Sequence, residues 1–206
     1  MQFDHIDKSY KYLDDILCII RQGILQKQSS LNKCKREGLR TQLLAETFNI
    51  IGANVSKNSI FAQKEHEREG DFNREDIYFY LSDDNYTRIF YIEAKRLPKY
   101  KSKTSEEYVT GISTSNKPSG GIQRFKSGRH GDYNLNYNGI IAFVENKSIE
   151  EWFSIVNNKL LIEYPNDTLL TPTNYSNEFR STHSYLQREK ETFVLCHFWI
   201  DLTKSL

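Results

Sequence analysis

Three residues in the middle of the sequence could together carry metal or acid–base chemistry: Asp76, Glu93 and Lys95. Two carboxylates held close together repel each other unless a positive charge neutralises them. A divalent cation does this well, and hard oxygen ligands favour Mg²⁺ or Mn²⁺. A lysine beside the pair could act on water or on a developing negative charge. The alternative is an exposed salt bridge between Lys95 and the two acids, and spacing alone leaves it open.

The chain around these residues predicts a β-hairpin. Residues 77–81 and 88–92 are rich in strand-forming side chains, and residues 82–86 between them have the composition of a turn. Asp84 and Asn85 suit a two-residue turn because both tolerate a positive φ. The sequence therefore predicts two antiparallel strands joined at this pair.

That turn would set the register of the hairpin. Ile77 would face Ile92 and Asp76 would face Glu93, with Cβ atoms about 4.5–5.5 Å apart. Strand alternation would place Lys95 on the same face as Glu93 and Tyr91. The other face would carry Phe90, Ile92 and Ala94. A slip of one residue would send Asp76 to the opposite face, so the prediction depends on the turn.

Hydrophobic spacing outlines the other elements. Helices are expected at residues 8–28, 35–49, 106–112, 121–131 and 149–161, and further strands at residues 60–67, 139–144 and 192–200. Gly52 is the expected stop of the second helix. These elements predict an α/β fold of the α+β mixed-sheet kind, with a central mixed β-sheet flanked by helices. We divide the chain into an N-terminal helical arm, 1–33, with a polar joint at 28–33, and a domain, 34–206; the arm could pack on the core or serve a partner.

Composition narrows the class of protein. The chain has 206 residues, 38% hydrophobic and 27% charged, which is typical of a globular domain. No apolar run reaches the length of a membrane helix, and the polar N-terminus lacks the apolar stretch of a signal peptide, so we expect a cytoplasmic protein. The three cysteines form no CxxC pair, the histidines show no metal-ligand spacing, and no phosphate-binding glycine loop is present.

Positive charge is concentrated in one block. The formal net charge is +1, yet residues 94–130 hold nine Lys or Arg and only two acids, a local balance of +7. Such a block suits a phosphate-binding face. A solvated loop with surface lysines is the alternative, and charge alone does not decide between them.

Taken in order, these residues resemble the PD-(D/E)XK signature of restriction-type endonucleases. Asp76 is followed, after a strand–turn–strand gap, by Glu93, Ala94 and Lys95. The proline of the signature is replaced by Glu75. The resemblance implies a restriction endonuclease-like core at about residues 35–145. It also implies a Mg²⁺- or Mn²⁺-dependent nuclease that hydrolyses phosphodiester bonds, with DNA expected, in a restriction or anti-phage defence system.

Two neighbouring segments extend the resemblance. The family usually places an acid on the helix before the sheet, and here Glu37 takes that position, with Glu46 as the alternative. Many members carry a polar residue on the helix after the core, and Gln123 matches it. The tyrosine found four residues later in RecB-like members is Ser127 here, which puts that part of the match in doubt.

The resemblance also implies roles. Asp76 and Glu93 would ligate the metal, the carbonyl of Ala94 could add an oxygen, and Glu37 would ligate a second ion or hold its water. Lys95 would orient or deprotonate water or stabilise the charged phosphate, and Gln123 would position the phosphate or the water. Backbone phosphates of the nucleic acid would be bound by Lys99, Lys101, Lys103, Arg124, Lys126 and Arg129.

Two other functions remain open at this point. One is a nucleic-acid-binding module whose nuclease site has decayed. The other is an assembly subunit that uses the helix at 8–28 and the strand containing Trp199. The sequence also leaves open DNA or RNA as substrate, and a homodimer or a larger defence complex with a targeting or ATPase subunit.

Overall fold

A computed structural model describes residues 7–55, 59–64, 76–99, 102, 106–113, 116–188 and 191–203. The helices are α1 (Lys8–Lys11), α2 (Leu13–Lys33), α3 (Glu37–Val55), α4 (Gly121–Lys126) and α5 (Ile149–Glu163). The strands are β1 (Ile60–Lys64), β2 (Ile77–Leu81), β3 (Arg88–Leu97), β4 (Tyr137–Val144), β5 (Thr171–Pro172), β6 (Glu178–Ser184) and β7 (Thr192–Asp201).

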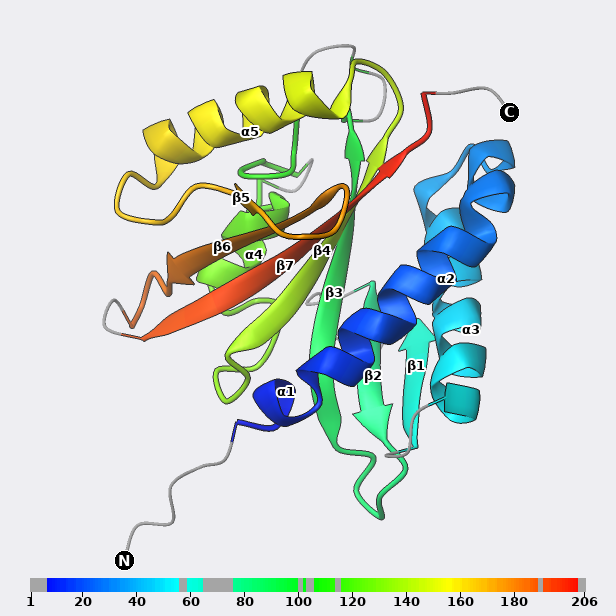
Figure 1. Cartoon of the computed structure of the whole chain (residues 1–206). Coiled ribbons are helices and arrows are strands. Elements are labelled where there is room, and N and C mark those ends of the chain that lie inside the picture. Colours follow the sequence, from blue (N-terminus) through cyan, green and yellow to red (C-terminus); the bar gives the residue numbers. More distant parts are fainter. Residues whose placement is uncertain are drawn as a thin grey trace, which may run out of the picture.

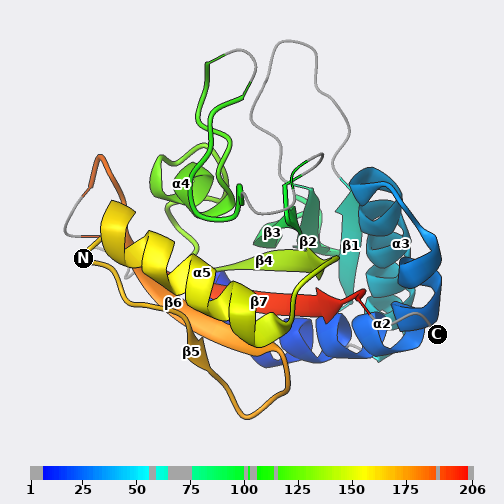
Figure 2. The same ribbon diagram turned by 90° about the horizontal axis from the view of Figure 1, so that it is seen from above.

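The strands form one mixed sheet in the order β1-β2-β3-β4-β7-β6-β5. β3, β4 and β7 are parallel neighbours, and the outer pairs on both sides are antiparallel. The long helices α2 and α3 cover one face, whereas α4 and α5 lie on the other (Figures 1 and 2). The predicted mixed sheet with flanking helices is therefore confirmed.

Each face of the sheet has its own hydrophobic cluster. Phe90, Ile92 and Ala94 of β3 belong to the cluster under α2 and α3. Tyr91 and Leu97 belong to the cluster under α4 and α5. Strand alternation therefore directs Glu93, between Ile92 and Ala94, toward the side of α4. Its position on the face opposite Phe90, Ile92 and Ala94 is the one that the sequence predicted.

The hairpin register is confirmed near Asp76, although the predicted turn is wrong. Ile77 pairs with Ile92 and Phe79 with Phe90. Residues 82–87, rather than a two-residue turn, connect the strands. The register shifts after Phe79, so that Tyr80 pairs with Arg88. This β-bulge absorbs the longer connection and leaves the end of the hairpin next to Asp76 unchanged.

The N-terminal helix is part of the core. α2 continues through the expected joint at residues 28–33 to Lys33, and its side chains at Ile16, Ile20 and Leu31 are fully buried against the sheet cluster. α3 passes through Gly52, where a helix end was expected. A Cβ there would lie 2.2 Å from the carbonyl oxygen of Ile60, so glycine permits the close contact between α3 and β1.

Two other secondary-structure predictions need correction. Residues 106–113 form an irregular segment rather than a helix. The Glu106 carboxylate there accepts hydrogen bonds from the backbone amides of Tyr108 and Val109, the latter at 2.7 Å, in competition with helical bonding. The sequence also failed to predict β5 and β6, which extend the sheet beyond β7.

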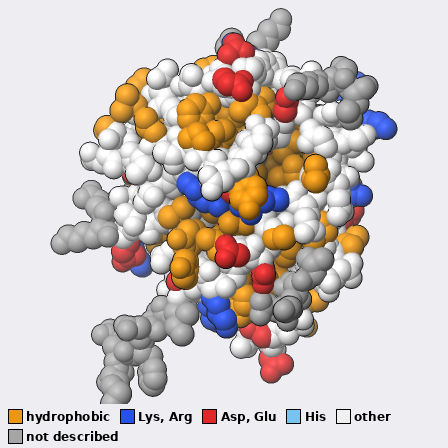
Figure 3. Space-filling model, viewed as in Figure 1, with side chains coloured by type: hydrophobic (Ala, Val, Ile, Leu, Met, Phe, Trp, Pro, Cys, Tyr) orange, Lys and Arg blue, Asp and Glu red, His pale blue; other side chains and the backbone are white. Residues whose placement is uncertain are grey.

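Three further features concern the helices, the cysteines and the surface. Among the described residues no helix is long and apolar enough to cross a membrane. Cys196 is buried, whereas Cys18 is exposed and Cys34 is half-buried, so only one of the three thiols lies in the core. Figure 3 shows hydrophobic side chains in several separate patches on one face, with Lys and Arg in a short band near its centre.

Candidate active site

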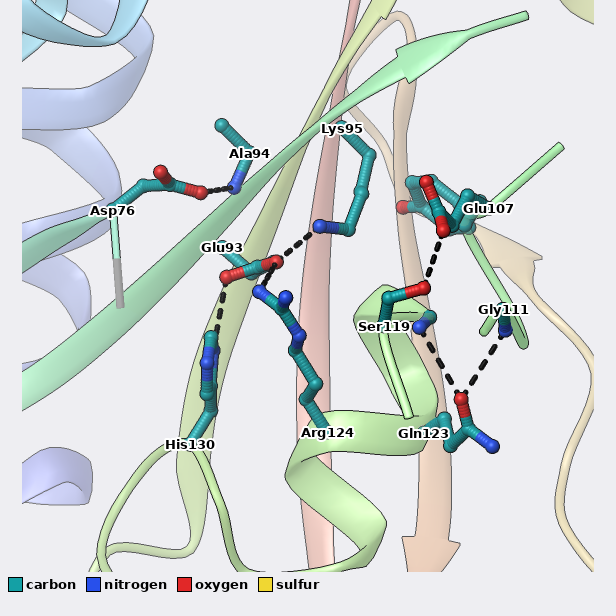
Figure 4. A network of polar contacts seen from close by, with 12 residues as sticks. Asp76, Glu93, Ala94, Lys95, Glu107, Gly111, Ser119, Gln123, Arg124 and His130 are labelled. Atoms are coloured by element: carbon teal, nitrogen blue, oxygen red, sulfur yellow. Dashed lines mark hydrogen bonds and ion pairs between the residues drawn. The ribbon is translucent and has the colours of Figure 1, made fainter. Parts of the chain in front are cut away.

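Glu93 is the centre of the candidate site. Its side chain is 0% exposed. One oxygen, Oε1, forms ion pairs with Lys95 Nζ and with Arg124 Nη1, the latter at 2.8 Å. The other oxygen, Oε2, lies 2.9 Å from His130 Nδ1. Figure 4 shows Lys95, Arg124 and His130 converging on this carboxylate.

These neighbours fix the charge of Glu93 and Lys95. Burial alone disfavours a carboxylate, but Lys95, His130 and Arg124 hold the pKa of Glu93 well below its usual range. Burial likewise disfavours the charged lysine, yet Glu93 outweighs it and raises the pKa of Lys95. At neutral pH the pair is therefore a carboxylate and an ammonium group.

Asp76 lies directly before β2 and bonds to the chain on either side of Glu93. Its backbone amide donates to the carbonyl oxygen of Ile92 at 3.0 Å, and its Oδ2 accepts from the amide of Ala94 at 2.7 Å. Burial and the negative charge of Glu93 raise the pKa of Asp76 to about 8. The charge of Lys95 opposes this rise but does not outweigh burial and Glu93.

Glu37 reaches the same site from the first turn of α3. Burial raises its pKa, and Lys95 and Glu93 are among the charges that act on it. Glu46, the alternative acid of this helix, is exposed and accepts a hydrogen bond from Gln42 at 2.7 Å. Of the two candidates, the structure brings Glu37 to the site.

Gln123 does not join the carboxylates. Its Oε1 accepts hydrogen bonds from the backbone amides of Gly111 and Gly120, both at 3.2 Å. Figure 4 shows the side chain turned toward Gly111 and away from Glu93. The side-chain amide therefore ties Gly111 and Gly120 to α4.

The sequence did not predict the contacts of Arg124 and His130 with Glu93. Arg124 was expected to bind a nucleic-acid phosphate, and no role was predicted for His130. His130 reaches Glu93 because the chain reverses after α4, with positive φ at Gly128 (67°) and Gly131 (80°). Those two glycines were the available signal, since they favour left-handed turns on both sides of the histidine.

Several Lys and Arg side chains of residues 94–130 form ion pairs within the protein. The predicted phosphate contact of Lys126 is wrong. Its side chain is 4% exposed and its Nζ forms an ion pair with Asp167 Oδ2 at 2.6 Å, so it is not available to a nucleic acid. Lys99 is 40% exposed and pairs with Glu107 at 3.0 Å, and Arg129 is half-buried. Arg96 pairs with Glu145. Lys101 and Lys103 lie outside the described residues.

A second buried polar chain links Asp167, β6, β7 and the 106–113 segment. Its members are Asp167, His183, Ser181, His197, Tyr108 and Trp199. The successive contacts measure 2.7 Å from Asp167 to His183, 2.7 Å to Ser181, 2.7 Å to His197, 2.6 Å to Tyr108 and 3.0 Å to Trp199.

This chain has one consistent pattern of donors. Trp199 Nε1 can only donate, and the Asp167 carboxylate, paired with Lys126, accepts. With both histidines neutral, each ring donates through one nitrogen and accepts through the other. Burial lowers the pKa of both His183 and His197, in agreement with neutral rings. We call these six residues the neutral chain.

Comparisons of the sequence and structure with protein-family models, curated proteins and solved structures found no match. Within the described residues, no group of three or more His, Cys, Asp or Glu side chains is arranged to hold a metal ion. The family resemblance therefore stays a prediction, and only the residues of the site bear on its chemistry.

Proposed function

We propose that the chain is a metal-dependent nuclease that hydrolyses phosphodiester bonds, with DNA as the expected substrate. The observation that carries the proposal is the fully buried Glu93, paired with Lys95 and bracketed by Asp76. A buried, charged group held this way is expensive and is characteristic of functional sites. Glu37 adds a third carboxylate near the same point.

The residues fit a divalent cation. Asp76 and Glu37 have raised pKa values because they are buried near another carboxylate, Glu93, and a cation would favour their ionised forms. Mg²⁺ is commonly held by one or two carboxylates plus substrate oxygens and water, so three clustered protein ligands are not required.

Asp76 and Glu93 are the proposed carboxylate ligands, with the Ala94 carbonyl as a third oxygen, and Glu37 would ligate a second ion or hold its water. When bound, the cation would polarise the phosphate and lower the pKa of the attacking water. Lys95 is held cationic by Glu93, so we assign it to stabilising negative charge on the phosphate rather than to removing a proton. Arg124, 28% exposed, could bind the same phosphate.

The order of the elements also supports the proposal. An acid-bearing helix, α3, is followed by a hairpin with Asp76, Glu93 and Lys95, then by α4 and the buried strand β4. This is the order that the resemblance to PD-(D/E)XK nucleases implies. A restriction or anti-phage role, and a homodimer or a targeting or ATPase partner, follow from that resemblance alone.

The test is cleavage of supercoiled plasmid and of single-stranded DNA with Mg²⁺ or Mn²⁺, with EDTA as the metal-free control. Lys95→Ala should lower the cleavage rate by about 10²–10³-fold, because it removes a charge that acts on the phosphate. Lys33→Ala is the matched control, since Lys33 is exposed at the end of α2, and it should cleave like wild type.

The outcomes separate the alternatives. Cleavage that requires metal and is lost in Lys95→Ala supports the nuclease. If the wild type binds DNA but neither cleaves it nor binds metal by calorimetry, the chain is the decayed binding module instead. If the wild type binds metal but does not cleave these DNAs, and Asp76→Ala abolishes the metal binding, the chain acts on another substrate or requires a partner.

A further inference from the structure

Three basic side chains already engage both oxygens of the Glu93 carboxylate. Lys95 Nζ and Arg124 Nη1 contact Oε1, the latter at 2.8 Å, and His130 Nδ1 lies 2.9 Å from Oε2. The protein therefore neutralises this buried carboxylate by itself. A cation that binds Glu93 must compete with one of these three partners.

The three partners differ in their freedom to leave Glu93. Their side chains are 2% exposed for His130, 12% for Lys95 and 28% for Arg124. Lys95 lies on the same strand as Glu93, and the His130 ring packs against Phe125 with centroids 5.9 Å apart. Arg124 reaches the carboxylate from α4 (Figure 4), and Glu93 is its only ion-pair partner among the described residues. Arg124 is therefore the partner that can exchange Glu93 for another anion.

A backbone phosphate is the anion that the proposed function brings to this point. A guanidinium group binds carboxylates and phosphates through the same fork of N–H groups. The bond to Glu93 uses Nη1 of Arg124, which leaves the rest of the fork for a first contact with a phosphate. The exchange from carboxylate to phosphate can thus begin before the ion pair breaks.

We propose that Arg124 pairs with Glu93 in the free protein and transfers to a backbone phosphate when nucleic acid binds, so that nucleic acid and the divalent cation bind cooperatively. Without Arg124, Glu93 has one fewer positive neighbour, which favours a cation there. This inference rests on the proposed metal-dependent nuclease and makes Arg124 the residue that couples its cofactor to its substrate. Because such coupling is reciprocal, the cation must tighten nucleic-acid binding by the same factor.

The test measures binding to the full chain rather than activity. Calorimetry gives the Mn²⁺ affinity with and without a short phosphorothioate DNA, which keeps its backbone charge and whose integrity a denaturing gel verifies. The DNA should tighten Mn²⁺ binding by about 5–150-fold. Fluorescence anisotropy of the same DNA, labelled, with Mn²⁺ and with EDTA should give the same factor.

Arg124→Gln removes the charge that competes with the cation. The variant should bind Mn²⁺ at least about fivefold more tightly than wild type without DNA, and DNA should then add less than about threefold. Arg188→Gln is the matched control, because Arg188 also pairs with a glutamate, Glu191, at 3.2 Å, and it should behave like wild type. Circular dichroism verifies folding, and Arg124→Met replaces Arg124→Gln if that variant is unfolded.

The inference and the proposed function can fail separately. It is overturned if DNA leaves the wild-type Mn²⁺ affinity unchanged, if the coupling survives the loss of Arg124, or if the wild type binds no Mn²⁺ or no DNA. Metal-dependent cleavage without coupling leaves the nuclease intact and rejects this role of Arg124. Coupling that depends on Arg124 in a chain that cleaves no DNA keeps the role and rejects the nuclease.

Discussion

The candidate site and the neutral chain are both buried and polar, yet they are built in opposite ways. In the neutral chain, Ser181 and the two histidines each have a matched donor and acceptor. In the candidate site, Glu93 forms ion pairs with Lys95, Arg124 and His130, whereas burial and the charge of Glu93 raise the pKa of the neighbouring Asp76 to about 8.

The comparison distinguishes buried polar groups that stabilise the fold from buried polar groups that serve a function. A fully satisfied network stabilises and orients a fold, because each buried group has replaced its lost water. A site that holds carboxylates close together keeps free energy that a ligand can recover on binding.

Asp76→Asn should reduce metal-dependent cleavage by on the order of 10³-fold, about 4 kcal/mol, because it removes a proposed metal ligand. The fold should survive, since the asparagine carbonyl can still accept from the amide of Ala94. Plasmid cleavage at saturating Mn²⁺ gives the measurement. Asp83→Asn, in the exposed turn of the same hairpin, is the control; equal activity in both variants would contradict the assignment.

The neutral chain should respond to acid. Unfolded histidine takes up a proton near pH 6.5, whereas burial lowers the pKa of His183 and His197, so the unfolded state binds more protons below that pH. These two groups should therefore remove up to about 2.7 kcal/mol of stability per pH unit as the pH falls below about 6.5.

His197→Gln isolates half of that effect. Urea unfolding from pH 7 to 5.5 should show the variant gaining up to about 1.4 kcal/mol per pH unit relative to wild type, because glutamine does not titrate. An identical pH slope in His197→Gln and wild type would mean that His197 is not held neutral.

Tyr108→Phe should lower the free energy of unfolding by about 1–3 kcal/mol, because His197 Nδ1 and Trp199 Nε1 would both lose a buried partner. Cleavage by the folded variant should stay within a few-fold of wild type. Denaturant unfolding and a cleavage assay at low temperature measure the two properties. A large activity loss without a stability loss would place Tyr108 in the site rather than in the framework.

Gln123→Ala should have the smallest effect. It removes one acceptor shared by the amides of Gly111 and Gly120, which should cost about 1 kcal/mol of stability and less than about tenfold in cleavage. Arg124→Ala is the neighbouring comparison, since that side chain contacts Glu93. If Gln123→Ala were the more damaging of the two for cleavage, the role expected from the sequence would be restored.

The part of the site carried by the hairpin could be predicted from the sequence. The apolar strands at 77–81 and 88–92 fix their own register through paired side chains, so Asp76 and Glu93 come together even with a wrong turn. Glu37 followed from the resemblance and its position on a helix. These features depend on local patterning, which a sequence displays directly.

The remainder depends on contacts between distant segments. β6 was missed because its inward residues include Ser181 and His183, whose polarity hides the alternation expected of a buried strand. His130 reaches Glu93 only through the reversal between Gly128 and Gly131. Lys126 looked like a surface charge because its partner, Asp167, lies 41 residues away.

The β-bulge after Phe79 has an evolutionary consequence. Ile77 and Phe79 pair with β3 on the side of the bulge away from the turn. The turn at residues 82–87 therefore does not determine the position of Asp76. Insertions, deletions and substitutions at the tip should accumulate without moving the carboxylates. The hairpin thus offers a loop that can diversify rapidly, for instance to fit a new partner, on a strand pair whose chemistry stays constant.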